Sequence, residues 1–406
     1  MKLDILFLGR LFPRDIEADI KAKMKTGMQD AANALQWNII DGLDANDCGS
    51  VKILSYLPID SYPKGYADRR IEPYVFQHTE KYRSDDLVVG CTNLTIVKQF
   101  ANLRPFKKQV KVWLQQKDGR KKVLMLYTAM PMFMQLAKYA KRLDPSVTIC
   151  CVIADLPEFA TVSDLHGIKA LYNRYQTGQS AALYRYVDKF VLLTEQMAQK
   201  LGITVPFVVM EGIAPGAETE EDSTLAQQYK NEKYILYTGT LNYKFGIGEL
   251  LDAFAQIKDP QLRLMICGFG QAEARIREEM AKDPRILFLG RVDRKQVLPL
   301  QRGATALVNP RQNNEEFTKY SFPSKTMEYL AAGVPVVAYK LDGIPNEYDG
   351  YLHYVQDDSI ESLAAKLQEI CGLDAAEREN IGRRGAEFVL QNKNPRVQAK
   401  RIIEFI

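Results

Sequence analysis

The sequence has few of the residues that form disulfides or bind metals, and it has no long apolar stretch. Its 406 residues include six cysteines and three histidines, and no two cysteines have C-x-x-C spacing. This usage disfavours a disulfide framework and a zinc site and is typical of a reducing cytoplasm. No run of about 18 apolar residues occurs, which excludes a membrane-spanning helix. The N-terminal MKLDILFLGR predicts a buried strand and not a secretion signal.

The usual catalytic signatures are also missing. His78, His166 and His353 have no metal-ligand spacing, so we expect each to be structural. No G-x-S-x-G motif occurs, and no loop carries a D-x-D pair that would hold Mg²⁺ on a sugar nucleotide. We therefore expect chemistry that uses neither a metal ion nor an organic cofactor.

The net charge is only +4, but it is unevenly distributed. Basic residues exceed acidic ones by eight over residues 1–210, whereas residues 211–406 have an acidic excess of four. Residues 98–122 hold nine basic side chains against one acid, Asp118. The first half should therefore contact something anionic, and DNA, RNA, an acidic membrane surface and a phosphorylated substrate all stay open at this point.

The second half alternates short apolar runs with amphipathic segments. The apolar runs are Tyr234–Tyr237, Leu262–Cys267, Ile286–Leu289, Ala304–Val308 and Val334–Ala338. Strands that are apolar throughout and alternate with helices are typical of a parallel sheet covered on both faces. The pattern predicts a doubly wound α/β domain.

The first half shows the same pattern less regularly. Its apolar runs include Leu3–Leu8, Leu87–Val89, Val123–Tyr127, Val147–Ala154 and Lys189–Leu193. The chain length suits two domains, and we expect them over residues 1–215 and 216–393. A last helix, about 394–406, is expected to return to the first domain. Two Rossmann-like domains place a ligand at the carboxyl ends of their strands, in the cleft between them.

The segment 309–337 carries the clearest signal for chemistry. A strand ends near Val308, a polar loop follows, and a helix begins near Pro323, which suits the first helical position. We expect Ser321 to cap this helix, and Gly333 to end it. Free N–H groups at such an N-terminus attract an anion.

Lys325 and Glu328 make this helix unusual. A cation in the first turn opposes the helix dipole and costs a few tenths of a kcal/mol, and a bound diphosphate would reverse that effect. Glu328, about one turn later, could accept hydrogen bonds from a sugar or ribose hydroxyl. The alternative is an ordinary solvated pair at i,i+3.

The segment 320–337 resembles the signature of the family 4 glycosyltransferases, which have the GT-B architecture of two facing Rossmann-like domains. Glu328 falls on the second of the family's two signature glutamates, and residues 330–337 match the Leu-Ala-x-Gly-x-Pro-Val-Val tail. Tyr320 replaces the first glutamate. The form Tyr-Ser-Phe-Pro-Ser-Lys is similar to a branch that builds bacterial capsular, exopolysaccharide and lipopolysaccharide chains.

The resemblance implies a set of donor contacts in the second domain. It implies that the donor contacts the backbone at Ser321, Phe322, Pro323 and Ser324, chiefly through N–H groups. Lys325 is expected to bind phosphate, Glu328 to bind hydroxyls and Tyr320 to contact the sugar. Of these four backbone positions proline has no N–H group to donate. Family members often clamp the diphosphate with an arginine and a lysine, but this chain has Thr240 and Phe245 there, with Lys244 adjacent. Lys244, Lys325 or Arg10 would then supply the charge.

Other candidate positions have plain structural alternatives. Gly268 follows a strand in a lone G-x-G, which a tight turn also explains. Arg291 and Arg311 lie near where such enzymes hold the base, although either could be a surface arginine. In the first domain, Gly9 and Arg10 form the loop that the family brings to the donor phosphates. Asp155 lies where family members often place an acid facing the acceptor, and a helix-capping aspartate is the alternative.

The resemblance implies a retaining hexosyltransferase that uses a nucleotide diphosphate sugar, with UDP favoured and GDP possible. The missing D-x-D loop predicts that the reaction needs no metal ion. A donor phosphate oxygen would help deprotonate the acceptor hydroxyl. The acceptor is expected to be a glycan or a polyprenyl- or lipid-linked sugar in bacterial surface polysaccharide synthesis. Two alternatives are a nucleotide-sugar 2-epimerase of the same fold and a non-catalytic binding subunit, which the loss of the first glutamate would suit.

The basic stretch 98–122 has a candidate role in this setting. Its lysines and arginines alternate with apolar residues such as Phe106, Val110 and Trp113, a mixture typical of binding at a membrane interface. We expect a cytoplasmic protein that docks peripherally on the anionic inner face of the cell membrane. A solvated helix surface is the alternative. Nucleic acid is not an expected partner, because no recognition motif accompanies the charge.

Overall fold

The computed structural model describes residues 2–25, 30–95, 103–156, 168–214 and 223–406. The chain divides into two compact units. The first unit comprises Met1–Ile213 and Pro395–Ile406, and the second comprises Ala214–Asn394. Lys98 and His166 lie outside the described residues, so what the sequence predicts for them stays a prediction.

An eight-stranded sheet forms the centre of the first unit, in the order β10-β9-β8-β7-β1-β2-β5-β4. Its strands are β1 (Leu3–Gly9), β2 (Gly49–Ser55), β4 (Tyr74–Phe76), β5 (Asp86–Val88), β7 (Lys121–Tyr127), β8 (Thr148–Ile153), β9 (Lys189–Leu192) and β10 (Phe207–Val209). Only β4 pairs antiparallel, with β5, and β3 (Arg70–Ile71) and β6 (Cys91–Thr92) form a separate ribbon. Every residue of β1 is buried, as a central strand covered on both faces requires.

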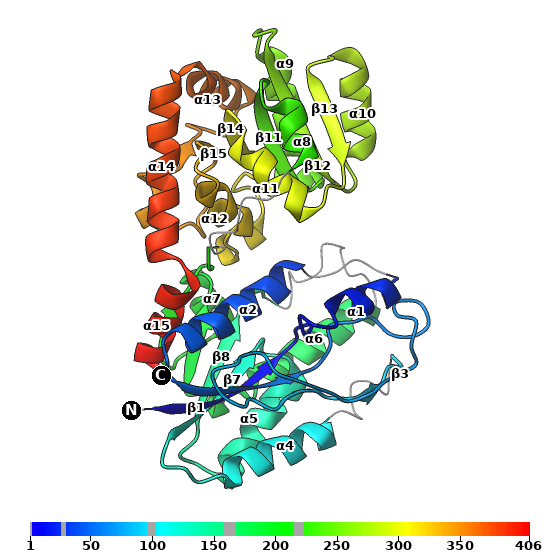
Figure 1. Ribbon diagram of the computed structural model, residues 1–406, viewed down its shortest axis with the longest axis vertical. Helices are drawn as coiled ribbons and strands as arrows, with labels where there is room; N and C mark the ends of the chain where they lie inside the picture. Colours follow the sequence, from blue (N-terminus) through cyan, green and yellow to red (C-terminus); the bar gives the residue numbers. More distant parts are fainter. Residues whose placement is uncertain (1, 26–29, 96–102, 157–167, 215–222) are drawn as a thin grey trace. The chain divides into compact units, whose positions relative to one another are not determined.

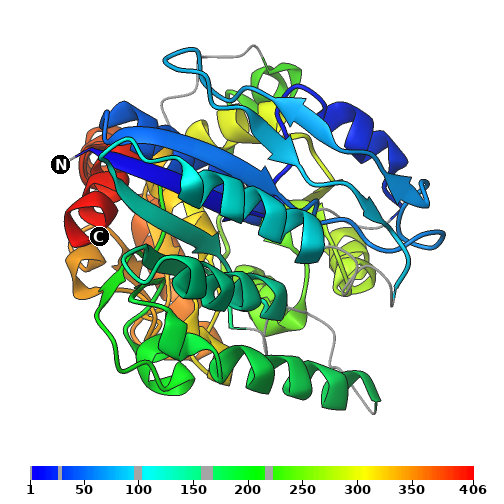
Figure 2. The same cartoon turned by 90° about the horizontal axis from the view of Figure 1, so that it is seen from below.

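Helices cover both faces of this sheet (Figures 1 and 2). They are α1 (Glu17–Lys23), α2 (Asp30–Ala45), α4 (Leu103–Gln115), α5 (Pro131–Leu143), α6 (Ile168–Ala181), α7 (Gln196–Leu201) and α15 (Pro395–Phe405). α15 lies beside α2, and α4 lies beside α5 on the other face. Gly42 permits the close packing of α2 on α15, because a Cβ at this position would lie 2.1 Å from the carbonyl oxygen of Pro395.

The second unit contains a parallel sheet of six strands in the order β13-β12-β11-β14-β15-β16. These are β11 (Lys233–Thr240), β12 (Leu262–Phe269), β13 (Ile286–Gly290), β14 (Ala306–Asn309), β15 (Val336–Ala338) and β16 (His353–Tyr354). The helices are α8 (Thr224–Tyr229), α9 (Ile247–Gln256), α10 (Glu273–Lys282), α11 (Arg294–Arg302), α12 (Ser324–Ala331), α13 (Ile360–Gly372) and α14 (Ala375–Asn392). The prediction of a doubly wound α/β architecture from the apolar runs is confirmed.

The structure changes the interpretation of the basic stretch. α4 buries Phe106, Val110, Trp113 and Leu114, so these apolar side chains belong to the core of the first unit and do not face a membrane. Arg104, Lys108, Lys111 and Lys117 stay exposed. The Lys122 ammonium lies 2.6 Å from the Asp4 carboxylate and over the Trp113 ring, so this lysine is paired within the unit and does not extend the exposed basic face. What remains outside is a basic helix face with little apolar surface.

Candidate functional site

The start of α12 is open at the end of the second sheet. Pro323 is the N-cap residue, one position before the first helical residue, and no side chain caps the helix. The prediction that Ser321 is the cap is wrong. Its hydroxyl accepts a hydrogen bond from Nη2 of Arg311 at 2.7 Å and donates one to the carbonyl of Phe317 at 3.1 Å. The partial positive charge of the helix terminus is therefore not neutralised by a capping side chain.

Glu328 holds the densest set of polar contacts near this helix end. Its Oε1 accepts hydrogen bonds from Gln301 Nε2 at 2.8 Å and Lys325 Nζ at 3.1 Å, and its Oε2 accepts one from Arg294 Nη1 at 2.8 Å. Burial alone would raise the pKa of Glu328, but Lys325, Gln301 and Arg294 lower it to about 2. The carboxylate is thus ionised and fixed in orientation at neutral pH.

The pair of Lys325 and Glu328 does form, at 3.1 Å. It is not simply a solvated surface pair, because only 14% of the Glu328 side chain is exposed. Lys325 retains 38% exposure, and its Cε lies 3.8 Å from the position that a Cβ on Gly239 would take. The ammonium group is therefore placed beside the end of β11 and remains accessible to a ligand.

Side chains outside the predicted set hold this arrangement together. Gln301, in α11, is fully buried and donates to both Glu328 and the hydroxyl of Thr238, at 3.1 Å. The hydroxyl of Tyr329 accepts from the N–H of Thr238 at 2.8 Å and donates to its carbonyl at 3.1 Å. These bonds join α11 and α12 to β11. A glutamine in an apolar stretch was the available signal, since a buried amide is costly unless it is hydrogen-bonded.

The remaining side chains of the signature segment face different ways. Phe322 is buried, with its ring 5.3 Å from that of Tyr348, and Pro323 is buried as well. Ser324 is exposed, and Tyr320 at the end of a short 3-10 turn is half-buried. The Phe322 ring is thus part of the core, which leaves only its backbone for contact with a donor.

Arg311 is not a surface arginine. The residue is 8% exposed, and its guanidinium lies over the Phe317 ring at 4.2 Å. Burial lowers the pKa of Arg311 to about 10, and its Nε has no hydrogen-bond partner among the described residues. The side chain is a buried cation whose hydrogen-bonding capacity is only partly used.

Gly268 has a packing role that needs no ligand. Its φ is +148°, and a Cβ there would lie 1.8 Å from the carbonyl oxygen of Gly239. The two strand ends of β11 and β12 can approach only because position 268 lacks a side chain. Gly268 lies within β12, so the close approach of the neighbouring strand requires the glycine, and not a tight turn. Its contact with a donor stays a prediction.

Three further candidates line the same end of the second sheet. Thr240 closes β11, and its carbonyl accepts a hydrogen bond from the Tyr237 hydroxyl at 2.9 Å. Lys244 follows in a 3-10 turn capped by Asn242. Arg291 follows β13 with its guanidinium 5.1 Å from the centre of the Phe269 ring. Their donor contacts stay predictions.

Gly9, Arg10 and Asp155 belong to the first unit. Gly9 ends β1, where a Cβ would lie 2.9 Å from the Phe7 ring. Asp155 follows β8 and is no N-cap residue of a described helix. Desolvation raises the pKa of Asp155 to about 6, which suits a group that exchanges protons near neutrality.

Over the described ranges, no cluster of three or more His, Cys, Asp and Glu side chains is placed to hold a metal ion. In the same part of the chain, no helix has the length and apolar composition needed to cross a bilayer.

Comparisons with known proteins agree with the fold. Residues 232–372 match the family model described as glycosyl transferases group 1, and no curated protein sequence matches the chain. Sucrose-phosphate synthase from Thermosynechococcus elongatus superposes with a TM-score of 0.64 at 19% identity, over 100% of this chain and 98% of that one.

Two other solved structures are similar over their whole length. An α,α-trehalose 6-phosphate synthase from Burkholderia multivorans has a TM-score of 0.62 at 11% identity, covering 100% of this chain and 96% of its own. The lipopolysaccharide outer core galactosyltransferase WaaB has a TM-score of 0.58 at 13% identity, covering 100% of this chain and 99% of its own. At these identities the likeness concerns the fold alone, and it confirms the GT-B architecture expected from the sequence.

Proposed function

We propose that this chain, whose residues 232–372 match the family model of the group 1 glycosyltransferases, transfers a hexose from a UDP-sugar to a hydroxyl of a glycan or lipid-linked acceptor with retention of configuration. The observation that carries this proposal is the ionised, oriented Glu328 beside Lys325 at the uncapped start of α12. A GDP-sugar is the alternative donor. Synthesis of a bacterial surface polysaccharide is the proposed setting.

The hydrogen-bonding capacity of Glu328 supports a role in holding donor hydroxyls. A carboxylate oxygen accepts about two hydrogen bonds. Oε1 already accepts from Gln301 and Lys325, whereas Oε2 accepts from Arg294. One acceptor position on Oε2 therefore remains for a hydroxyl, and a second becomes available when Lys325 turns toward a phosphate.

Lys325 and the helix terminus are suited to the leaving diphosphate. In the free protein the Lys325 ammonium is balanced by Glu328. A diphosphate at the N-terminus of α12 would contact backbone N–H groups and the ammonium together, and it would be stabilised more as negative charge grows on the leaving oxygen. The chain's own residues thus supply positive charge where bond cleavage creates negative charge.

Asp155 is proposed to face the acceptor, and Tyr320 to contact the donor sugar. Asp155 has a pKa raised to about 6, so it can accept a hydrogen bond from a hydroxyl at pH 7. Tyr320 stands where the family has a glutamate, and its half-buried phenol can contact a sugar ring through its face.

The test is donor binding and transfer by the full chain. We expect UDP-sugars to raise the thermal unfolding midpoint more than GDP- or dTDP-sugars do. Lys325→Ala and Glu328→Ala should each weaken UDP-sugar binding by about tenfold or more. Lys282→Ala and Glu279→Ala are matched controls, because that pair also has i,i+3 spacing, at 3.0 Å, on α10. Equal binding and transfer by all four variants would contradict the proposal. Tight binding without transfer to any acceptor would indicate a non-catalytic subunit.

We also propose that the exposed basic face of α4 docks on an anionic membrane surface. Arg104, Lys108 and Lys111 on α4, with Lys117 just after its end, support this proposal. The burial of Phe106 and Trp113 makes the attraction electrostatic. Binding to vesicles that contain phosphatidylglycerol should fall when Lys108 and Lys111 are changed to Glu. Replacing Lys366 and Lys400 by Glu in the same way serves as the control, and equal loss in both would refute the α4 assignment.

A further inference from the structure

Arg311 is enclosed between two aromatic rings just after the end of β14. Cζ of its guanidinium lies 4.2 Å from the centre of the Phe317 ring and 5.7 Å from that of the Phe245 ring. These two rings meet edge to face, with centroids 6.3 Å apart. A buried guanidinium whose N–H groups are only partly hydrogen-bonded is costly to fold. Stability alone therefore does not account for this arginine.

The guanidinium holds the segment that leads into α12 at two points. Its Nη2 donates to the hydroxyl of Ser321 at 2.7 Å, and this hydroxyl donates to the carbonyl of Phe317 at 3.1 Å. The same guanidinium covers the Phe317 ring. Arg311 thus contacts both ends of the stretch 317–321.

Tyr320 lies inside this stretch. It is the last residue of the 3-10 turn η3 (Glu316–Tyr320), and Ser321 follows it directly. Side chains three residues apart in a 3-10 helix lie on the same edge of the helix, so Tyr320 shares an edge with Phe317. The position of the half-buried phenol is therefore set by residues on either side of it, and both contact Arg311.

Close backbone contacts keep the loop 310–321 in place. Gly246, the N-cap residue of α9, has a φ of +80°, and a Cβ there would lie 1.9 Å from the carbonyl oxygen of Pro310. At the other end of the loop, a Cβ on Gly343 would lie 2.6 Å from the carbonyl oxygen of Ser321. Packing this tight leaves little room for movement. A binding group needs such support in order to stay in one geometry.

We propose that Arg311 is a positioning residue that holds Tyr320 against the sugar of the donor, so that it governs recognition of the hexose and not of the nucleotide. This inference rests on the proposed function, in which Tyr320 contacts the sugar. It replaces the expectation that Arg311 lies near the nucleobase. A phenol packs on a hexose through its face, and a small rotation of the turn that carries it would remove that contact.

The test compares the donor with and without its sugar, on the full chain. UDP, UDP-glucose, UDP-galactose and UDP-N-acetylglucosamine are titrated by calorimetry well below the unfolding midpoint. The measured quantity is the ratio of two affinities, that for the sugar nucleotide which the wild type binds most tightly and that for UDP. Arg311→Met keeps an unbranched side chain between the rings and removes the guanidinium. It should lower this ratio by about tenfold.

A double-mutant cycle shows whether Arg311 acts through Tyr320. Tyr320→Ala removes the sugar contact itself and should lower the same ratio. The double variant should then lose no more than Tyr320→Ala alone, because coupled residues do not contribute additively. Additive losses would overturn the proposal.

Two further variants support the comparison. Ser321→Ala leaves the backbone N–H in place and removes only the hydroxyl that Arg311 contacts, so it should lower the ratio by a smaller factor. It also carries the test if Arg311→Met does not fold. Arg277→Met is the matched control, because Arg277 is exposed on α10 with its Cζ 4.8 Å from the centre of the Phe288 ring. This control should leave the ratio unchanged.

Thermal unfolding without ligand separates positioning from folding. Arg311→Met should unfold at the wild-type midpoint or above it, because an apolar side chain replaces an enclosed cation. A lower midpoint with an unchanged ratio would show a role in folding alone and would overturn the proposal. Equal losses for UDP and the sugar nucleotide would also overturn it, and would favour a contact with the nucleotide.

The wild type distinguishes the failure of this inference from that of the proposed function. If the wild type binds no nucleotide sugar, the proposed function fails and the role of Arg311 falls with it. If the wild type binds one and the ratio does not change in Arg311→Met, only the role of Arg311 fails.

Discussion

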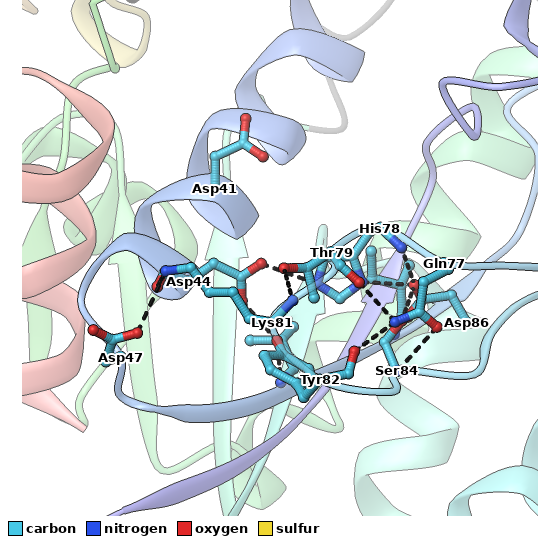
Figure 3. A network of polar contacts seen from close by, with 12 residues as sticks. Asp41, Asp44, Asp47, Gln77, His78, Thr79, Lys81, Tyr82, Ser84 and Asp86 are labelled. Atoms are coloured by element: carbon cyan, nitrogen blue, oxygen red, sulfur yellow. Dashed lines mark hydrogen bonds and ion pairs between the residues drawn. The ribbon is translucent and has the colours of Figure 1, made fainter.

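His78 and Asp86 form a buried pair in the first unit, with Nδ1 of the imidazole 2.6 Å from Oδ2 of the carboxylate (Figure 3). On the other side of the ring, Nε2 lies 3.3 Å from Oδ2 of Asp44. The His78 side chain is only 1% exposed. Tyr82 donates to Asp44 at 2.6 Å and Ser84 to Asp86 at 2.6 Å. The histidine expected to be structural thus joins α2, β5 and the segment between β4 and β5.

Replacing His78 by Gln should destabilise the protein strongly. The change leaves two buried carboxylates, Asp44 and Asp86, without their shared cation, and breaking a buried ion pair in this way costs about 3–5 kcal/mol. Urea unfolding measures the loss. Arg83→Gln is the control, because the Arg83–Asp85 pair lies at the surface, and it should leave the free energy of unfolding unchanged. A similar result for both variants would contradict the role of His78.

The same cluster predicts how stability depends on pH. Burial would lower the pKa of His78, but hydrogen bonds and charge from Asp44 and Asp86 raise it from 6.5 to about 9. The folded state therefore binds this proton more tightly, so the stabilisation is fully present below pH 6.5 and is lost as pH rises through about 9. The difference between the unfolding free energies of the wild type and His78→Gln should therefore shrink by about 3 kcal/mol as pH rises over this range. A gap that stays constant would exclude the linkage.

Removing Gln301 should impair donor binding without removing any charge. Gln301→Leu takes one hydrogen-bond donor from Glu328 and one from Thr238, so the carboxylate loses part of its orientation and its pKa rises. UDP-sugar affinity should fall by about tenfold, and its loss on acidification should begin at a higher pH than in the wild type. Calorimetry from neutral pH down to about pH 2 measures both effects, because the pKa of Glu328 is about 2 in the wild type.

Gln256→Leu is the control for that experiment, because Gln256 is exposed and its Nε2 lies 3.5 Å from Oε1 of Glu361 at the surface of the unit. It should bind UDP-sugars as the wild type does. An unchanged pH profile in Gln301→Leu would show that Gln301 serves packing alone.

Gly268→Ala should destabilise the second unit. The new Cβ would lie 1.8 Å from the Gly239 carbonyl oxygen, in a backbone with φ of +148°, and such strain costs at least about 2 kcal/mol. Gly350→Ala is the matched control, because nothing lies within 4 Å of its Cβ position. Thermal unfolding of both variants measures the difference. Equal midpoints would refute the close approach of β11 and β12.

Local patterns in the sequence determined the architecture and the signature helix. Continuous apolar runs predict buried parallel strands because both faces of each strand are covered. Lys325 and Glu328 are neighbours by helix spacing alone, so their contact at 3.1 Å required no knowledge of the fold. The resemblance to the family rests on the same short segment.

Only the tertiary structure decided which groups are buried and which partners they meet. Gln301 reaches Glu328 across 27 residues, and Gln36 reaches Arg10 across 26. Periodicity cannot predict such pairs, because they depend on how helices pack on a sheet. The same limit explains Ser321, which bonds to Arg311 instead of capping α12, and the apolar face of α4, which packs into the core. Spacing along the chain sets local geometry, and long-range packing sets the burial and charge environment on which binding depends.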